Sequence, residues 1–172
     1  MFSGTIRPYR DGDHDQVRDL FIRVNRGLAP AALKARFEAY IELALREEID
    51  RIGAYYAAAS GSSFWVAVEG SAVAGTVGIE ASAPGVYELR RMYVDPARRR
   101  RGLGRALLDH AEATCRRQGG TKIVLSTSEL QTAAVALYTA AGYRLLGEVI
   151  ATEATNKTVG GGIRRFEFEK EL

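Results

Sequence analysis

Apolar residues recur at helical spacing in four parts of the chain. These parts cover about residues 13–26, 31–59, 103–118 and 133–141, and in each the apolar positions fall on one helix face. Glycine or proline follows the first, third and fourth parts, as is typical where helices end. The second part is long for one helix, so we expect a kink or break near Gly53.

Shorter segments carry the alternating or compact apolar patterns of strands. They lie at about residues 5–9, 64–68, 73–80, 86–94, 123–126, 143–150 and around Phe166 and Phe168. Short turns at residues 69–71 and 84–85 join three of them consecutively, which favours antiparallel pairing. The polar stretch from Thr152 to Gly162 ends in glycines and predicts a mobile loop.

The order of these elements predicts one α/β (α+β) domain over residues 1–172. Its helices, about four, would pack on a mixed, mostly antiparallel sheet of about seven strands. The length of 172 residues and the hydrophobic content of 47% allow a sizeable core. No apolar run approaches the roughly 20 residues that span a membrane, and no secretory signal pattern is present, so a cytoplasmic protein is expected.

Few residues suit covalent or metal chemistry. The one cysteine, Cys115, cannot form an intrachain disulfide and is expected to pack in the core. His14 and His110 have no metal-ligand spacing with it, so no metal is expected. The net charge of +3 is too small to indicate a nucleic-acid-binding protein by itself.

The segment from Val94 to Leu108 carries the strongest chemical signal. A strand ends at Asp95-Pro96, and a run of arginines, Gly102-Leu103-Gly104 and an amphipathic helix follow. Backbone N–H groups at a helix start bind phosphate, and nearby arginines add charge-assisted contacts. The spacing is neither a dinucleotide fingerprint nor a P-loop. From these residues alone, a phosphate-binding turn, a tight structural turn and a solvated or nucleic-acid-binding arginine patch all stay open.

Three segments together resemble the GNAT superfamily of acetyl-CoA-dependent N-acetyltransferases. They are the turn Arg99-Arg100-Arg101-Gly102-Leu103-Gly104, the strand from Glu88 to Pro96, and Leu137-Tyr138-x-x-x-Gly142-Tyr143. They stand in the family's order and spacing, whereas residues 1–59 agree only in the order of predicted elements. The resemblance implies a GNAT-like fold and transfer of the acetyl group of acetyl-CoA to a primary amine by direct attack in a ternary complex.

The resemblance also implies how acetyl-CoA is held. Backbone amides of the turn would cradle the pyrophosphate, and the free edge of the strand before it would pair with the pantetheine arm. A bulge would splay that strand from the 123–126 strand and open the slot, and an amide at or near Met92 would stabilise charge on the carbonyl oxygen. Many relatives carry Asn where this chain has Gln131, whose longer stem bears the same groups; Ser128 or Thr132 could take its place. The expected cofactor-binding residues are Met92, Tyr93, Val94, Arg99, Arg100, Arg101, Gly102, Leu103, Gly104, Arg105 and Gln131.

Two residues are the candidates for proton transfer. Tyr138 matches the family's helix tyrosine, whose phenol would protonate the departing thiolate; alternatively, it only packs. Glu88 matches a position where several members place a general base, acting directly or through water. Beside Arg90 and Arg91 it could instead form only surface ion pairs, and some members use a water chain.

The acceptor is expected to be a small-molecule amine or a protein amine, in a pocket shaped by residues 25–40. Four glutamates could attract a cationic amine, but i,i+4 pairs of Glu42 with Arg46 and Glu47 with Arg51 favour a solvated helix instead. Those glutamates are Glu38, Glu42, Glu47 and Glu48. Aromatic residues that could line the pocket, but are more typical of a core, are Tyr55, Tyr56, Phe64 and Trp65. The loop near residues 155–162 could close over the acceptor.

Two other functions remain as alternatives. A non-catalytic acyl-CoA-binding sensor or regulatory module would bind acetyl-CoA without turnover. A nucleic-acid-binding domain would show steeply salt-dependent DNA binding that acetyl-CoA does not disturb. The favoured interpretation has no nucleic-acid or membrane partner and leaves a homodimer open.

Overall fold

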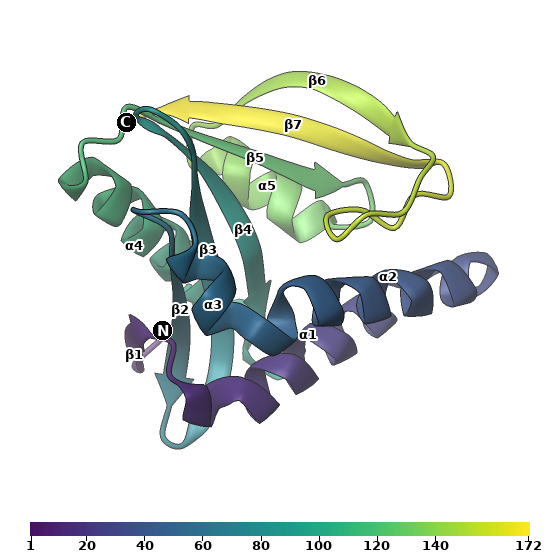
Figure 1. Ribbon diagram of the computed structural model, residues 1–172, viewed down its shortest axis with the longest axis horizontal. Helices are drawn as coiled ribbons and strands as arrows, with labels where there is room; N and C mark the ends of the chain where they lie inside the picture. The colour runs from purple at the N-terminus through teal and green to yellow at the C-terminus, as the bar shows by residue number, and fades with distance from the viewer.

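A twisted seven-stranded sheet forms the centre of the computed structural model, which describes residues 1–172 (Figure 1). The strands are β1 (Thr5–Pro8), β2 (Ser63–Glu69), β3 (Ala72–Ala83), β4 (Val86–Val94), β5 (Lys122–Ser128), β6 (Arg144–Ala151) and β7 (Ile163–Glu171). Their order in the sheet is β1-β2-β3-β4-β5-β7-β6, and every neighbouring pair is antiparallel except β4 and β5. The predicted mixed, mostly antiparallel sheet is therefore confirmed.

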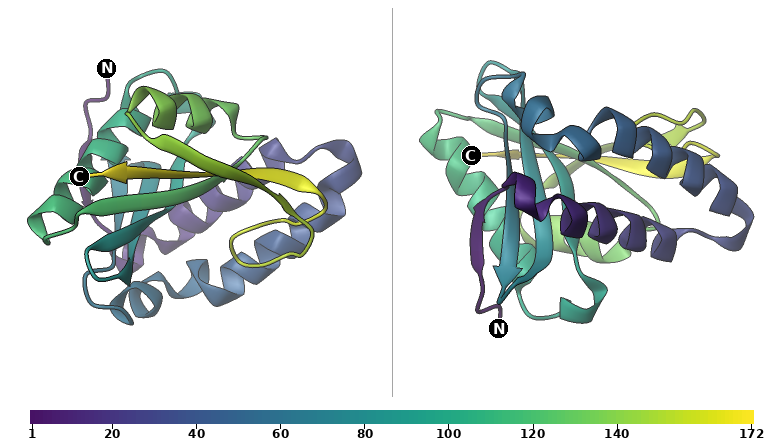
Figure 2. Two further views of the ribbon diagram at one scale, coloured as in Figure 1. Left: turned by 90° about the horizontal axis from the view of Figure 1, so that it is seen from above. Right: turned by 60° about the horizontal axis from the view of Figure 1, so that its bottom comes forward.

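Helices cover both faces of this sheet (Figure 2). They are α1 (His14–Leu28), α2 (Lys34–Glu47), α3 (Ile52–Ala57), α4 (Leu103–Arg117) and α5 (Thr132–Ala140). The apolar stripes of α1, α2 and α3 pack on one face, and those of α4 and α5 pack on the other. Cys115 is fully buried on α4, as expected. None of the helices combines the length and the apolar content needed to cross a membrane.

The break in the second helical region comes earlier than its glycine suggested. Helix α2 ends at Glu47, a 3-10 turn covers Ile49–Arg51, and Gly53 lies inside α3. The expected break is therefore present, but at residues 48–51 instead of at Gly53. The chain turns at Glu48, whose backbone leaves the helical region (φ −139°, ψ −58°), and its side chain enters the interior of the protein.

Strands β4 and β5 separate along their length and leave an opening in the sheet (Figure 1). They pair only where Val86–Glu88 lies beside Lys122–Val124. Beyond that point the β3–β4 register shifts between Thr76 and Gly78, and Arg91 has a φ of +50°. The extra residue of a bulge bends its strand, so the predicted bulge and splay are both confirmed.

Candidate active site

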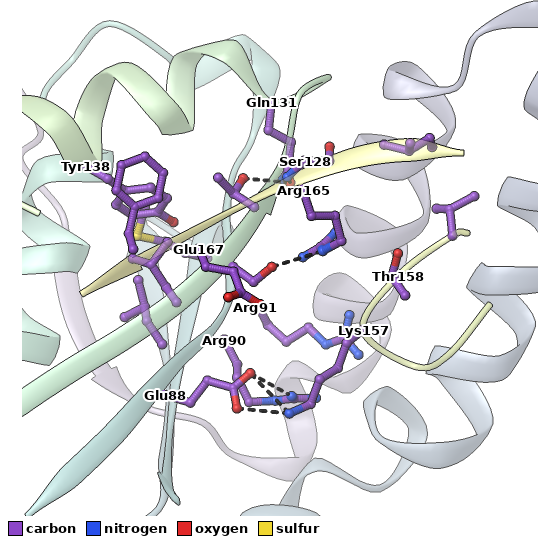
Figure 3. Close-up of a pocket in the computed structure, with 18 of the residues that line it drawn as sticks. Glu88, Arg90, Arg91, Ser128, Gln131, Tyr138, Lys157, Thr158, Arg165 and Glu167 are labelled. Carbon is purple, nitrogen blue, oxygen red and sulfur yellow. Dashed lines mark hydrogen bonds and ion pairs between the residues drawn. The ribbon is translucent and has the colours of Figure 1, made fainter. Parts of the chain in front are cut away.

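A cavity of about 540 Å³ occupies the opening between β4 and β5. Side chains reach it from both faces of the sheet (Figure 3). Tyr138 comes from α5, with its ring near Tyr143 and Phe168. Glu88 comes from β4 on the other face, the one covered by α1–α3. The two residues expected to transfer protons thus border one cavity.

The Tyr138 phenol is almost fully buried yet free to donate. The residue is 5% exposed and lines the cavity, and its hydroxyl forms no hydrogen bond with another side chain or with the backbone. Burial, together with nearby Tyr93, raises the pKa of Tyr138 above its ordinary value of 10.0. The phenol therefore stays protonated at neutral pH, as a general acid requires.

The Glu88 carboxylate is held by cations. The Lys157 ammonium donates to both carboxylate oxygens, at 3.1 Å and 2.9 Å, and Arg90 Nη1 lies 3.5 Å from Oε1 (Figure 3). The alternative of an ion pair between Glu88 and Arg90 is therefore found, although Arg90 is buried rather than at the surface. The stronger partner, Lys157, comes from the loop before β7 and could not be predicted from the neighbours of Glu88 in the sequence.

A buried ion cluster supports the floor of this site. The Glu48 carboxylate accepts from Arg90 Nη2 at 2.5 Å, from Arg91 Nη2 at 2.7 Å and from the Tyr56 hydroxyl at 2.7 Å. Burial alone would raise the pKa of Glu48, but Arg91 and Arg90 outweigh it and hold that pKa at about 2. The carboxylate therefore stays charged and fixes both arginines beneath the cavity. Gly78 makes room for this cluster, because a Cβ there would lie 2.6 Å from the Tyr56 hydroxyl oxygen.

Glu48 is therefore buried, unlike the solvated helix face that the i,i+4 pairs favoured for this region. Its neighbours Glu42 and Glu47 are exposed, but neither forms the expected i,i+4 ion pair. Glu38 instead binds Arg26 across the α1–α2 connection, with oxygens 2.8 Å and 3.0 Å from the guanidinium. The α2 helix is thus held by partners distant in sequence, which helical spacing cannot reveal.

The loop from Thr152 to Gly162 lies against the cavity instead of extending into solvent. Arg91 donates to the Asn156 carbonyl oxygen, Lys157 binds Glu88, and Val159 is buried in the core beneath α1 and α2. Lys157, Thr158 and Val159 line the cavity. In the structure the loop therefore covers the site, and its glycines at 160–162, all with positive φ, turn the chain back into β7.

The turn after β4 offers a row of unused hydrogen-bond donors. The backbone N–H groups of residues 99–105 donate to no backbone or side-chain acceptor, and Gly102 at the start of α4 provides no side-chain cap. Positive φ values at Arg100 (+60°) and Gly102 (+78°) curl the chain, and successive N–H groups in such a curl bind anions. This is the geometry that a phosphate-binding turn needs.

Most arginine side chains of this turn already have acidic partners. Arg98 and Arg101 lie 3.5 Å and 3.2 Å from Glu69, and Arg105 lies 2.8 Å from Asp109. Arg99 and Arg100 are exposed without such a partner. The donors that remain at the turn are therefore mainly those of the backbone.

The other residues expected to contact the cofactor differ in how many of their hydrogen-bonding groups are unpaired. Met92, Tyr93 and Val94 follow the last β4–β5 pair, so the edge of β4 that faces β5 has no strand partner there. Gln131 lines the cavity, but its Oε1 accepts from the Thr127 hydroxyl at 3.0 Å and from the Ser128 N–H at 3.3 Å. Its amide nitrogen is the part left to contact a ligand.

The face of the cavity opposite Tyr138 contains residues that the sequence motifs do not mark. Asn25, Phe37 and Tyr40 line it, within the predicted 25–40 region. Arg165 and Glu167 line it from β7, where the alternation with Phe166 and Phe168 indicated only a strand. The four aromatic residues considered for a pocket, Tyr55, Tyr56, Phe64 and Trp65, do not line it.

A sheet splayed between β4 and β5, followed by a turn rich in free amides, is the architecture of acetyltransferases of the GNAT family. Two solved structures share the fold. An acetyltransferase of the GNAT family from Staphylococcus aureus Mu50 has a TM-score of 0.76 and 20% identity over 99% of both chains. A GNAT superfamily phosphinothricin acetyltransferase from Sinorhizobium meliloti, in complex with acetyl-CoA, has a TM-score of 0.76 and 19% identity over 100% of this chain and 89% of its own.

The family model described as Acetyltransferase (GNAT) family matches residues 26–143, so this chain belongs to that family. Human N-acetyltransferase 8B is 34% identical over 114 residues, which are 63% of this chain and 50% of the relative. N-acetylaspartate synthetase of Danio rerio is 36% identical over 110 residues, which are 63% of this chain and 39% of the relative. The matches thus span about half the length of these curated relatives or less.

Proposed function

We propose that this chain transfers the acetyl group of acetyl-CoA to a primary amine by direct attack in a ternary complex. The observation that carries the proposal is the cavity through the sheet, which a protonated phenol borders from one face and a carboxylate borders from the other. Such an opening lets a donor and an acceptor approach from opposite faces, so that they meet without a covalent enzyme intermediate.

Acetyl-CoA supplies the activated acetyl thioester, and the chain has groups that fit its parts. The free N–H groups of residues 99–105 would hold the pyrophosphate. The unpaired edge of β4 from Met92 to Val94 would hydrogen-bond the amide groups of the pantetheine arm. The Gln131 amide nitrogen faces the same cavity and would add one donor.

Glu88 and Tyr138 then divide the proton transfers. An amine at neutral pH is mostly ammonium, and Glu88 would accept its proton directly or through water. Tyr138 would donate its phenolic proton to the sulfur that leaves as the amine nitrogen bonds to the acetyl carbon. The second proton that this nitrogen loses would restore the phenol, directly or through water. In the structure Glu88 holds the primary ammonium of Lys157, and an acceptor ammonium would replace Lys157 at that carboxylate.

Cys115 takes no part in this scheme. It is fully buried on α4, and burial raises the pKa of its thiol to about 12. A thiolate is the nucleophilic form of cysteine, so an acyl-cysteine intermediate has no support here. The acetyl group would pass directly to the amine.

Calorimetry with acetyl-CoA, followed by a free-thiol assay with a panel of amines, tests the proposal. We expect saturable binding, and thiol release that depends on one class of amine. Absence of acetyl-CoA binding would overturn the whole scheme. Binding with no turnover on any amine would instead identify a non-catalytic acyl-CoA-binding module.

A further inference from the structure

Arg165 stands apart from the other cations of the cavity. Arg90 and Arg91 bind the Glu48 carboxylate, and Lys157 binds Glu88. Arg165 has no acidic partner within ion-pair distance, and its one side-chain hydrogen bond is from Nε to the Ser126 hydroxyl, at 3.0 Å (Figure 3). Burial lowers the pKa of this guanidinium, yet an arginine stays charged. A half-buried cation with unused donors therefore faces the cavity.

An acid without a partner lies two residues away on the same strand. Glu167 also lines the cavity and forms neither an ion pair nor a side-chain hydrogen bond in the structure. Residues i and i+2 of a strand share a face and lie about 7 Å apart. Because Arg165 and Glu167 do not bind each other, β7 presents separate positive and negative groups to the same space.

The strand register places these charges along the opening. Glu167 pairs with Ser126 and Arg165 pairs with Ser128, whereas β4 and β5 separate after Glu88 and Val124. Glu88 therefore lies at the closed end of the opening, beside Val124. The Arg165 guanidinium, hydrogen-bonded to Ser126, lies two residues of β5 farther toward the mouth. This order suits a molecule that places its ammonium at Glu88, toward the closed end, and an anionic group at Arg165, farther toward the mouth.

We propose that the acceptor is an amino acid or a similar amine with a carboxylate, and that Arg165 binds that carboxylate. The planar guanidinium can donate two parallel hydrogen bonds to a carboxylate, which would satisfy its unused donors. Glu167 would favour the ammonium end of the same molecule. This inference rests on the proposed acetyl transfer and adds the class of amine.

Matched acceptors test it directly. An α-amino acid is compared with its α-amide, which keeps the amine and the side chain but lacks the negative charge. We expect kcat/KM to be about 10- to 100-fold higher for the acid, since a hydrogen bond to a charged group changes affinity by about that factor. The difference should appear mainly in KM, because Arg165 would bind the carboxylate before and during the reaction alike.

Variants of β7 assign the preference to one residue. In Arg165→Gln, kcat/KM for the acid should fall to that for the amide, while turnover of the amide is kept; Arg165→Lys should restore part of the preference. Arg164→Gln is the matched control, because Arg164 is exposed on the same strand and pairs with Glu148 at 3.3 Å. Calorimetry with acetyl-CoA shows that each variant remains folded.

The outcomes separate this inference from the proposed function. No turnover of either acceptor by a chain that binds acetyl-CoA would defeat the acetyl transfer itself. Turnover of amides or simple amines at least equal to that of the acids would leave acetyl transfer standing and overturn the role of Arg165. Equal losses on acid and amide in Arg165→Gln would overturn it as well, because a merely structural arginine would act on both.

Discussion

The two sides of the opening differ in the groups that they present to a ligand. On the α4 side, the proposed pyrophosphate site consists of backbone N–H groups of residues 99–105 and hardly depends on side chains. On the α1–α3 side, the cavity depends on side chains brought together from β4, α2, the 152–162 loop and β7. A site made of backbone can keep one ligand while the sequence around it varies. A site made of side chains can change its ligand by single substitutions.

Replacing Tyr138 by Phe should have the largest effect and should separate chemistry from binding. Loss of a general acid typically lowers a rate by 10²–10⁴-fold, so we expect kcat to fall about 10³-fold. The dissociation constant for acetyl-CoA should change little, because the turn lies outside the cavity that Tyr138 borders. Stopped-flow thiol release and calorimetry measure the two quantities. An unchanged kcat would leave Tyr138 a packing residue.

Replacing Glu48 by Gln should destabilise the acceptor side more than any surface change. It leaves two buried guanidinium groups without their carboxylate, and breaking such a cluster costs about 3–5 kcal/mol. Glu47→Gln is the control, since Glu47 is exposed and should cost less than about 0.5 kcal/mol. Urea unfolding compares the two. Similar free energies of unfolding for both variants would show that the cluster does not stabilise the fold.

The same cluster predicts how stability depends on pH. The folded-state pKa of Glu48 is about 2, below its ordinary value of 4.5. A depressed carboxyl pKa stabilises the folded state above pH 4.5, and that stability is lost as pH falls toward 2. Wild type should therefore lose more stability than Glu48→Gln between pH 5 and 3. Parallel losses in the two proteins would contradict the depressed pKa.

Sequence patterns could predict the fold, the turn after β4 and part of the cavity lining, but not most of the charged residues on the acceptor side. Periodicity places the strands and helices because each buries one face, and Gly102-Leu103-Gly104 marks a helix start with free amides. Nothing in the apolar pattern around α2 distinguishes buried Glu48 from exposed Glu47, since the arginine partners of Glu48 come from β4, more than 40 residues later. The position of Arg165 in the cavity could not be predicted either, because its alternation with Phe166 indicates a strand but not what the polar face of that strand contacts.

Replacing Glu88 by Gln should lower kcat about 100-fold, within the range for loss of a general base. The matched control is Glu80→Gln. The Glu80 carboxylate also lies near Arg90, at 3.2 Å, but Glu80 does not line the cavity. Steady-state rates at saturating acetyl-CoA distinguish the two. If Glu80→Gln slows the reaction as much as Glu88→Gln, the loss reflects a displaced Arg90, and a water chain remains as the base.

The smallest effect should come from the two exposed arginines of the turn, Arg99 and Arg100. Replacing both by Gln should weaken acetyl-CoA binding only about 2- to 5-fold, because water and salt screen the attraction between exposed charges. That loss should vanish at high salt.

Gly102→Ala is the comparison, because it keeps every charge and the added Cβ meets no atom within 4 Å. The φ of +78° at this position strains any residue with a side chain. Affinity for acetyl-CoA should therefore fall about 10-fold at all salt concentrations. Calorimetry across a salt series compares them; a larger, salt-dependent loss in the arginine variant would make side chains, not backbone amides, the holders of the anion.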